Sequence, residues 1–372
     1  MRIKHAFNEV CHESSSSSEE LVRFFRAPNM PLIIATIYAE CYQELGIEIF
    51  KKEDIVTVFF KNSLVEKTKE IGFAQLNSSY WFNEFKEHII QIIEEKRYFL
   101  QFSINRTEPI YFLISFLEVL KTFLKIYQFT EFFYTENAFQ ETLYKFEDFQ
   151  DIKNRLTELS LIKSEARKFL NSMLLGESSF LEVGISNLSK EVSLPKDLLF
   201  QLTNEEICHR EIPSSTILEK RKEYNYSMNW QDDELLICYE ERQLDYKHEN
   251  EVDHKPVMLK GKIASHGFYT GTAKIVEPDY LNYNKLPEIL ASVNEGDVLI
   301  CESTSPDLYV ICQKVGAIVT NQGGLGSHAA TLSRELGIPC VVGVAEATTI
   351  IQEGNIVEVD AIKGIITVIS RS

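Results

Sequence analysis

The residues best suited to chemistry lie in the string TNQGGLGSHAATLSRELGIPCVVG, in the last third of the chain. It places His328 directly after a glycine-rich turn that contains Gly323, Gly324 and Gly326. Ser327 stands where a helix N-cap belongs, and good helix formers follow until a glycine and a proline end the run. The pattern predicts a strand, a glycine-rich loop and a helix whose first turn carries His328.

This position suits phosphoryl transfer. The positive end of the helix dipole disfavours the imidazolium form, so the pKa of His328 should fall and the ring should stay neutral and nucleophilic. Free N–H groups of the first helical turn favour an attached phosphoryl group, and glycines let the backbone approach it. The alternative is that His328 only caps a turn. We predict that His328 is the nucleophile, with Gly323, Gly324, Gly326 and Ser327 binding the phosphate.

The elements that position this loop are expected to form a separate α/β domain over residues 258–372. After Pro256 glycines become frequent, and short β-rich runs alternate with helix-length segments. The runs are Leu259–Ala264, Gly271–Val276, Val298–Cys301, Ala317–Thr320, Cys340–Val342, Ile356–Val359 and Ile365–Ile369.

Most of this region resembles the mobile, swivelling domain of the family that contains phosphoenolpyruvate synthase, pyruvate phosphate dikinase and rifampin phosphotransferase. Four strings carry the resemblance: GKIASHGFYTGTAKIV, NEGDVLICESTSPDL, GAIVTNQGGLGSHAATLSRELGIPCVVG and GNIVEVDAIKGIITVI. The resemblance implies a β/β/α phosphohistidine domain in which His328 is the phosphoryl carrier. The sequence departs from the family at Gly326, where a threonine is usual, so the loop lacks one hydroxyl group.

Other polar residues of this region are first given structural roles. Thr304 and Ser305 lie in a loop before an expected helix, where Ser305 is a cap first and a phosphate contact second. His266 lies in a turn between two strands and is expected to be structural or solvated. Arg334 lies off the helical face of His328, so we expect it to form a packing or docking salt bridge.

The first two thirds of the chain have a different residue pattern. Residues 1–22, with a run of five serines, are predicted to be a flexible N-terminus. Residues 23–239 have few glycines and apolar residues three and four positions apart, which predicts an all-helical domain. Residues 240–257 are almost entirely polar and charged, as is typical of a linker. The predicted architecture is multidomain, α and α/β.

Two strings in the helical region, FFRAPNMPLIIATIYAECY and DLLFQLTNEEI, resemble the region before the swivelling domain in rifampin phosphotransferase and related synthases. The resemblance implies a domain that binds the phosphoryl acceptor or docks a partner. Its aromatic residues, including Phe112, Phe116 and Tyr127, are interpreted first as core and second as a ligand pocket.

Members of the resembled family make phosphohistidine from ATP with an ATP-grasp domain, which needs glycine-rich loops and metal-binding carboxylates. Residues 1–250 are glycine-poor and contain no P-loop or comparable loop. We therefore expect no cofactor on this chain alone, and we expect ATP and Mg²⁺ on a separate ATP-grasp protein. The phosphoryl acceptor is expected to be a small molecule, whose identity the sequence does not give.

Composition narrows the class of partner. A net charge of −17 disfavours nucleic acid and anionic membrane surfaces, since both require a basic face. The most apolar stretch, residues 109–133, is interrupted by charged side chains, which favours a buried helix over a membrane span. Seven cysteines without CxxC spacing give no support for a metal site. The chain opens without a basic-then-apolar leader, and we expect a cytoplasmic protein.

Three functions remain in competition. The leading hypothesis is the mobile subunit of an ATP-dependent, AMP-forming phosphotransferase or dikinase, a split enzyme in which the His328 domain swings on the 240–257 linker. The second is a non-enzymatic phosphocarrier or regulatory module. The third is a degenerate binding protein whose His328 is never phosphorylated. An ATP-grasp protein encoded nearby would favour the first two, and a ligand-sized pocket facing His328 would favour the first.

Overall fold

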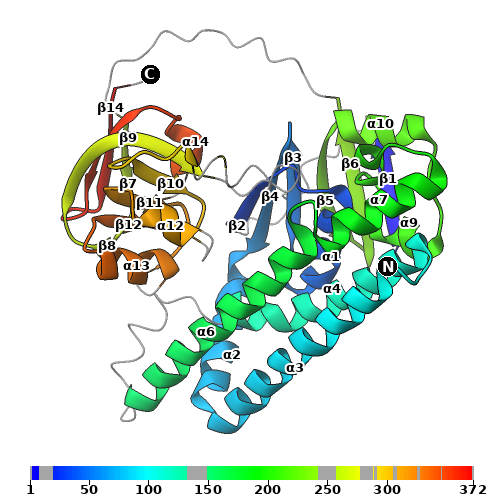
Figure 1. Ribbon diagram of the computed structural model, residues 1–372, viewed down its shortest axis with the longest axis horizontal. Coiled ribbons are helices and arrows are strands. Elements are labelled where there is room, and N and C mark those ends of the chain that lie inside the picture. The colour runs from blue at the N-terminus through cyan, green and yellow to red at the C-terminus, as the bar shows by residue number, and fades with distance from the viewer. Residues whose placement is uncertain are drawn as a thin grey trace. The chain divides into compact units, whose positions relative to one another are not determined.

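A computed structural model gives the fold of the chain (Figure 1). It describes residues 2–7, 20–131, 149–241, 257–276, 288, 291–304, 308–324, 327–344 and 346–370. The chain divides into two compact units, the first with the described residues up to 241 and the second with those from 257 on. Each unit combines helices with a mixed sheet, so the prediction of a chain with both helical and sheet elements is confirmed.

The N-terminal unit is built on a six-stranded sheet with the order β1-β6-β5-β3-β4-β2. Its strands are β1 Arg2–Phe7, β2 Leu21–Pro28, β3 Glu48–Lys52, β4 Ile55–Lys61, β5 Asn225–Gln231 and β6 Glu234–Glu240. β1 runs parallel to β6, and the other neighbouring strands are antiparallel. Strands from the two ends of the unit therefore meet in one sheet.

Helices fill the sequence between these strands. They are α1 Leu32–Cys41, α2 Asn62–Asn77, α3 Ser79–Ser103, α4 Pro109–Glu131, α6 Phe149–Leu174, α7 Phe180–Val192, α8 Lys196–Leu199, α9 Asn204–His209 and α10 Ser215–Glu223, with a short 3-10 helix at Gln43–Leu45. On α4, the side chains of Phe112, Phe116 and Tyr127 are at most 2% exposed. These aromatic residues are core, which was the first of the two interpretations of the sequence.

The prediction of an all-helical domain over residues 23–239 is wrong. In β4 the buried residues Val56, Val58 and Phe60 alternate with half-buried ones, which is the period of a strand. Most residues in this range belong to helices, so the helical spacing of apolar residues dominates the sequence pattern and hides the strands. The strands are short and find their partners far away in sequence, where a local pattern does not reach.

The prediction of a flexible N-terminus over residues 1–22 is also wrong where the structure describes that segment. Arg2–Phe7 form β1, which pairs with the strand from Glu234 to Tyr239, and β2 begins at Leu21. Residues 8–19, with the serine run, lie outside the described residues, and so do residues 242–256 of the predicted linker.

A buried polar cluster holds β1 in place. Arg221 of α10 is 3% exposed, and its guanidinium donates to both carboxylate oxygens of Glu206 on α9, at 2.8 and 2.9 Å. It also lies 3.1 Å from Nε2 of His5 on β1, whose Nδ1 lies 3.1 Å from the hydroxyl of Tyr239. Burial, together with the Arg221 cation, lowers the pKa of His5 to about 4. The neutral ring therefore bridges the helices and the sheet.

We predict that acidification destabilises the N-terminal unit through His5. The unfolded chain takes up a proton at the ordinary histidine pKa of 6.5, whereas the folded chain does so only at about 4, so stability falls as the pH drops from 6.5 toward 4. The loss should be on the order of 1–3 kcal/mol in denaturant titrations. His5→Gln should remove this part of the pH dependence, and His88→Gln, at an exposed histidine of α3, should not. Equal pH slopes in the wild type and His5→Gln would contradict the assignment.

The C-terminal unit has an eight-stranded sheet with the order β7-β14-β13-β9-β10-β11-β12-β8. Its strands are β7 Val257–Lys260, β8 Lys262–Ser265, β9 Phe268–Val276, β10 Val298–Cys301, β11 Ala317–Thr320, β12 Cys340–Val342, β13 Ile356–Asp360 and β14 Ile365–Ser370. β9 to β12 are parallel, and the other pairs are antiparallel. β7 and β8 stand at opposite ends of this order yet are joined by Gly261 alone, so the sheet folds back on itself.

Two apolar cores cover the two faces of the parallel strands. Val298 and Ile300 of β10 lie in a core shared with β13, β14 and the helix α14 Ala347–Ile350. Leu299 and Cys301 point to the other side, into a core shared with α12 Tyr309–Cys312 and α13 His328–Leu336. Burial on both faces explains why β10 and β11 are continuous apolar runs in the sequence. The layers of this unit are antiparallel strands, parallel strands and helices.

Candidate functional site

His328 is the first residue of α13, and local capping places it there. The hydroxyl of Ser327 accepts a hydrogen bond from the backbone N–H of Ala330 at 3.3 Å, so Ser327 is the N-cap. At the other end, Gly337 adopts the left-handed conformation that ends the helix. These bounds agree with the sequence pattern, because caps depend on neighbouring residues only.

The loop before α13 requires a glycine. Gly323 has a φ of 117°, and a Cβ at this position would lie 3.0 Å from the hydroxyl oxygen of Ser327. The backbone carbonyl of Gly324 accepts a hydrogen bond from the N–H of Ser327 at 3.1 Å. The loop therefore closes onto the start of the helix. Gly326 lies outside the described residues.

Thr304 is a part of the site that the sequence analysis did not connect with the histidine. Its hydroxyl oxygen lies 3.0 Å from Nδ1 of His328. Thr304 follows β10 and His328 follows β11, and the parallel pairing of these strands brings the two loops together. In the tautomer in which Nδ1–H donates to the Thr304 hydroxyl, Nε2 keeps its lone pair and is the ring nitrogen that can act as a nucleophile. The only sequence signal was its place in the STSPDL loop; Ser305 of that loop lies outside the described residues.

The electrostatic environment favours a neutral ring. The side chain of His328 is exposed, yet partial shielding from water lowers its pKa below the ordinary value, while Glu335 acts in the opposite direction. The direction agrees with the sequence prediction, and the largest cause of the lowered pKa is desolvation. A ring with a lowered pKa keeps its lone pair near neutral pH.

Arg334 and His266 are the other two polar residues of this unit to which the sequence analysis gave roles. Among the described residues no salt bridge of Arg334 is found, and its Nε donates to the carbonyl of Ala264 on β8 at 3.1 Å. The side chain thus packs α13 onto β8. His266 is exposed in the connection between β8 and β9.

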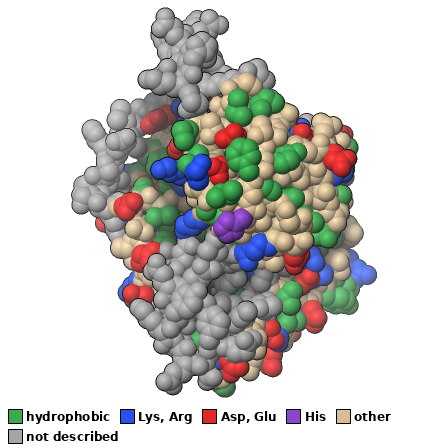
Figure 2. Space-filling view, turned by 90° about the vertical axis from the view of Figure 1, so that its left-hand side faces the viewer, with side chains coloured by type: hydrophobic (Ala, Val, Ile, Leu, Met, Phe, Trp, Pro, Cys, Tyr) green, Lys and Arg blue, Asp and Glu red, His purple; other side chains and the backbone are tan. Residues whose placement is uncertain are grey.

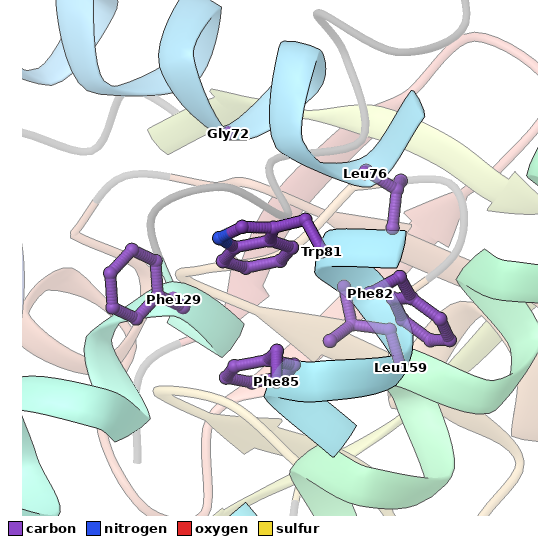
Figure 3. Close-up of a pocket in the computed structure, with 7 residues that line it drawn as sticks. All are labelled: Gly72, Leu76, Trp81, Phe82, Phe85, Phe129 and Leu159. Carbon is purple, nitrogen blue, oxygen red and sulfur yellow. The ribbon is translucent and has the colours of Figure 1, made fainter. Parts of the chain in front are cut away.

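Figure 3 shows a pocket in the N-terminal unit, lined by Gly72, Leu76, Trp81, Phe82, Phe85, Phe129 and Leu159. Trp81 stacks on Phe85 with 5.2 Å between ring centroids and meets Phe129 edge-on at 5.6 Å. The space left between these side chains holds roughly one water molecule. In this structure it is a small packing space, far below the size of a ligand site.

The described residues contain no group of histidine, cysteine, aspartate or glutamate side chains that could hold a metal ion. Over the same residues, no helix has both the length and the apolar character needed to cross a membrane. Figure 2 shows one face of the molecule, where exposed hydrophobic, basic and acidic side chains are mixed and a histidine is exposed among them.

Comparison with known proteins concerns the C-terminal unit. A family model described as PEP-utilising enzyme, mobile domain, matches residues 293–364. A probable phosphoenolpyruvate synthase of Archaeoglobus fulgidus is 39% identical over 110 residues, which are 30% of this chain and 14% of the relative. The phosphoenolpyruvate synthase of Pyrococcus furiosus is 42% identical over 116 residues, 31% of this chain and 13% of the relative. An uncharacterized phosphotransferase of Bacillus subtilis, YvkC, is 41% identical over 112 residues, 30% of this chain and 12% of the relative.

Among solved structures, an NMR solution structure of Enzyme I aligns over 86% of this chain and 88% of that chain, with 16% identity and a TM-score of 0.22. A crystal structure of aconitase X from Thermococcus kodakaraensis aligns over 31% of this chain and 99% of that chain, with 16% identity and a TM-score of 0.23. These scores are too low to establish a shared fold.

The sequence matches confirm the resemblance predicted from the four strings. They cover only 12–14% of the length of these curated relatives. The matched residues 293–364 include the loop with Thr304, the glycine-rich turn and His328. Residues 293–364, within the C-terminal unit, therefore match the mobile domain of PEP-utilising enzymes.

Proposed function

We propose that this chain is the phosphohistidine-bearing mobile subunit of an ATP-dependent, AMP-forming phosphotransferase or dikinase. One observation carries the proposal: His328 stands at the start of α13 with Nδ1 3.0 Å from the Thr304 hydroxyl, inside the region that matches the PEP-utilising mobile domain. In this proposal Gly323, Gly324, Gly326 and Ser327 surround the phosphoryl group with backbone N–H and hydroxyl donors.

In the charging reaction, Nε2 of neutral His328 attacks the β-phosphorus of ATP. The N–P bond forms while the bond from phosphorus to the bridging oxygen breaks, and AMP leaves with that electron pair. The β-phosphorus still carries the γ-phosphate, so water must then release inorganic phosphate to leave a phosphoryl group on the ring. Positive charge develops on the ring as the N–P bond forms, and Thr304 accepts the Nδ1–H hydrogen bond that this charge strengthens.

In the discharge reaction, a hydroxyl oxygen of the acceptor attacks the same phosphorus and releases its proton to water, and the electron pair of the N–P bond returns to Nε2. A carrier of this kind has to reach a charging site and an acceptor site in turn. ATP and Mg²⁺ are assigned to a separate ATP-grasp protein, since residues 1–250 contain no glycine-rich phosphate loop. The acceptor is a small molecule in this proposal.

A second candidate function is a non-enzymatic phosphocarrier that hands the phosphoryl group to another protein. The Trp81 pocket is too small for an acceptor, but an open pocket of about 210 Å³, lined in part by Asp151, Arg155 and Glu158, lies beside it, so pocket size does not separate the two functions. If purified components phosphorylate a small-molecule acceptor, this second candidate is excluded.

We predict that His328 is the residue labelled by ATP. Incubation with the ATP-grasp partner and β-labelled ATP should give an acid-labile, base-stable label on the chain, whereas γ-labelled ATP should release its label as inorganic phosphate. His328→Asn should abolish the label, because no other imidazole ring lies at the start of this helix. His266→Asn, at an exposed histidine of the same unit, is the matched control and should label normally. Persistent labelling of His328→Asn would show that His328 is not the labelled residue.

The lowered pKa of His328 predicts how charging depends on pH. The single-turnover charging rate should be constant above the ordinary histidine value of 6.5 and should fall only below it, because protonation removes the lone pair of Nε2. Glu335→Gln should move the fall to still lower pH, since Glu335 raises the pKa of His328. An inflection above 6.5 in the wild type would show that the ring is not shielded as described.

We further predict that the purified chain neither hydrolyses ATP nor binds it in the micromolar range. Calorimetric titration and an assay for AMP test this directly, with the ATP-grasp partner added back as the positive control. Production of AMP by the chain alone would remove the need for a separate charging protein, without affecting the role of His328.

A further inference from the structure

We propose that Glu302 is a positioning residue for phosphoryl transfer, holding the loop of Thr304 against the loop of His328. This inference rests on the proposed function of His328. Glu302 directly follows β10 and is only 6% exposed, which is unusual for a carboxylate. It does not contact the phosphoryl group in this proposal, but acts through the two loops.

The two loops leave neighbouring parallel strands. The ladder between β10 and β11 ends where Cys301 lies opposite Thr320. Two backbone hydrogen bonds continue it, from Asn321 N–H to the Cys301 carbonyl at 3.0 Å and from Gln322 N–H to the Glu302 carbonyl at 2.8 Å. After Glu302 and Gln322 the two loops diverge. The distance between Thr304 and His328 therefore depends on the contacts that hold Glu302 and Gln322 together.

The carboxylate of Glu302 supplies that connection. Its Oε2 accepts a hydrogen bond from Nδ2 of Asn321 at 2.6 Å, and its Oε1 accepts one from Nε2 of Gln322 at 3.2 Å. Both oxygens therefore face donors on the histidine loop. The charge strengthens these hydrogen bonds, and the low exposure of the group makes them expensive to lose.

Asn321 extends the connection to a third element. Its Oδ1 accepts a hydrogen bond from the backbone N–H of Thr348 on α14 at 3.1 Å, and its Nδ2 lies 2.7 Å from the hydroxyl of Thr348. Because a backbone N–H can only donate, this contact fixes the orientation of the Asn321 amide. Asn321 and Thr348 are at most 8% exposed, so the network lies within the unit.

Glu302→Gln tests the role with almost no change in size. A glutamine places an NH₂ group against one of the two donors, so one hydrogen bond is lost and two donors face each other. The loops should separate slightly, and Thr304 should lose its alignment with Nδ1 of His328. A displacement of this kind slows a transfer step by up to about a hundredfold.

Asp297→Asn is the matched control. Asp297 is 7% exposed at the opposite end of the same strand, where its carboxylate accepts a hydrogen bond from Asn294 N–H at 2.8 Å. It has no contact with either loop among its described partners, so this variant reports the cost of altering a buried carboxylate near β10. We expect both variants to fold, with Glu302→Gln alone slowing charging by about ten- to a hundredfold.

Thr304→Val separates positioning from a general structural effect. If Glu302 acts through Thr304, the double variant Glu302→Gln/Thr304→Val should charge no more slowly than Thr304→Val alone. Additive losses in the double variant would show that Glu302 acts by another route, and a wild-type charging rate in Glu302→Gln would overturn the proposal.

A measurement on the chain alone keeps this test independent of the proposed function. In ¹⁵N NMR spectra of the imidazole ring, Glu302→Gln should shift the Nδ1 and Nε2 resonances of His328 toward those of Thr304→Val, and Asp297→Asn should leave them in place. Absence of labelling in the wild type, with this shift present, would reject the carrier function and keep the positioning role. Unchanged ring resonances in Glu302→Gln would reject the positioning role even if His328 is labelled.

Discussion

The parallel pairing of β10 with β11 is the constraint on which the candidate site depends. Cys301 lies opposite Thr320, so the loops that follow leave the same edge of the sheet side by side. One loop brings Thr304 and the other brings the glycine turn and His328. Antiparallel neighbours would send these loops to opposite edges, and the ring would lose the hydroxyl that orients it. The chemistry of one side chain thus depends on the direction of two strands.

Packing on both faces makes this arrangement rigid. One core fixes β10 and β11 against the antiparallel strands, and the other fixes α13 through Ala329, Ala330 and Leu332. The start of α13 cannot shift without opening a close-packed interior. His328 itself is exposed, as the proposed carrier role requires. The unit therefore combines a fixed backbone with an accessible imidazole ring, and desolvation lowers the pKa of that ring.

The sheet of the N-terminal unit is assembled from strands at both ends of that unit, so it depends on pairing between distant parts of the sequence. β1 adds to the edge at β6, and the buried contacts of His5, Arg221 and Glu206 hold it there. Burying an ion pair costs desolvation energy, which the bidentate geometry offsets. The aromatic side chains between the helices are used in packing, and their remaining space is about the size of one water molecule.

The sequence by itself determined the features that depend on neighbouring residues. The bounds of α13, its Ser327 cap, the glycine turn and the apolar strands β10 to β12 could all be predicted, because caps, turns and periodicity are local. It also gave the family resemblance, which the match over residues 293–364 confirms. Only the tertiary structure decided the contact of Thr304 with His328, the buried network of Glu302 and the sheet that joins Arg2–Phe7 to β6. Each of these joins residues far apart in the chain, and their partners are chosen by strand pairing and burial rather than by any local pattern.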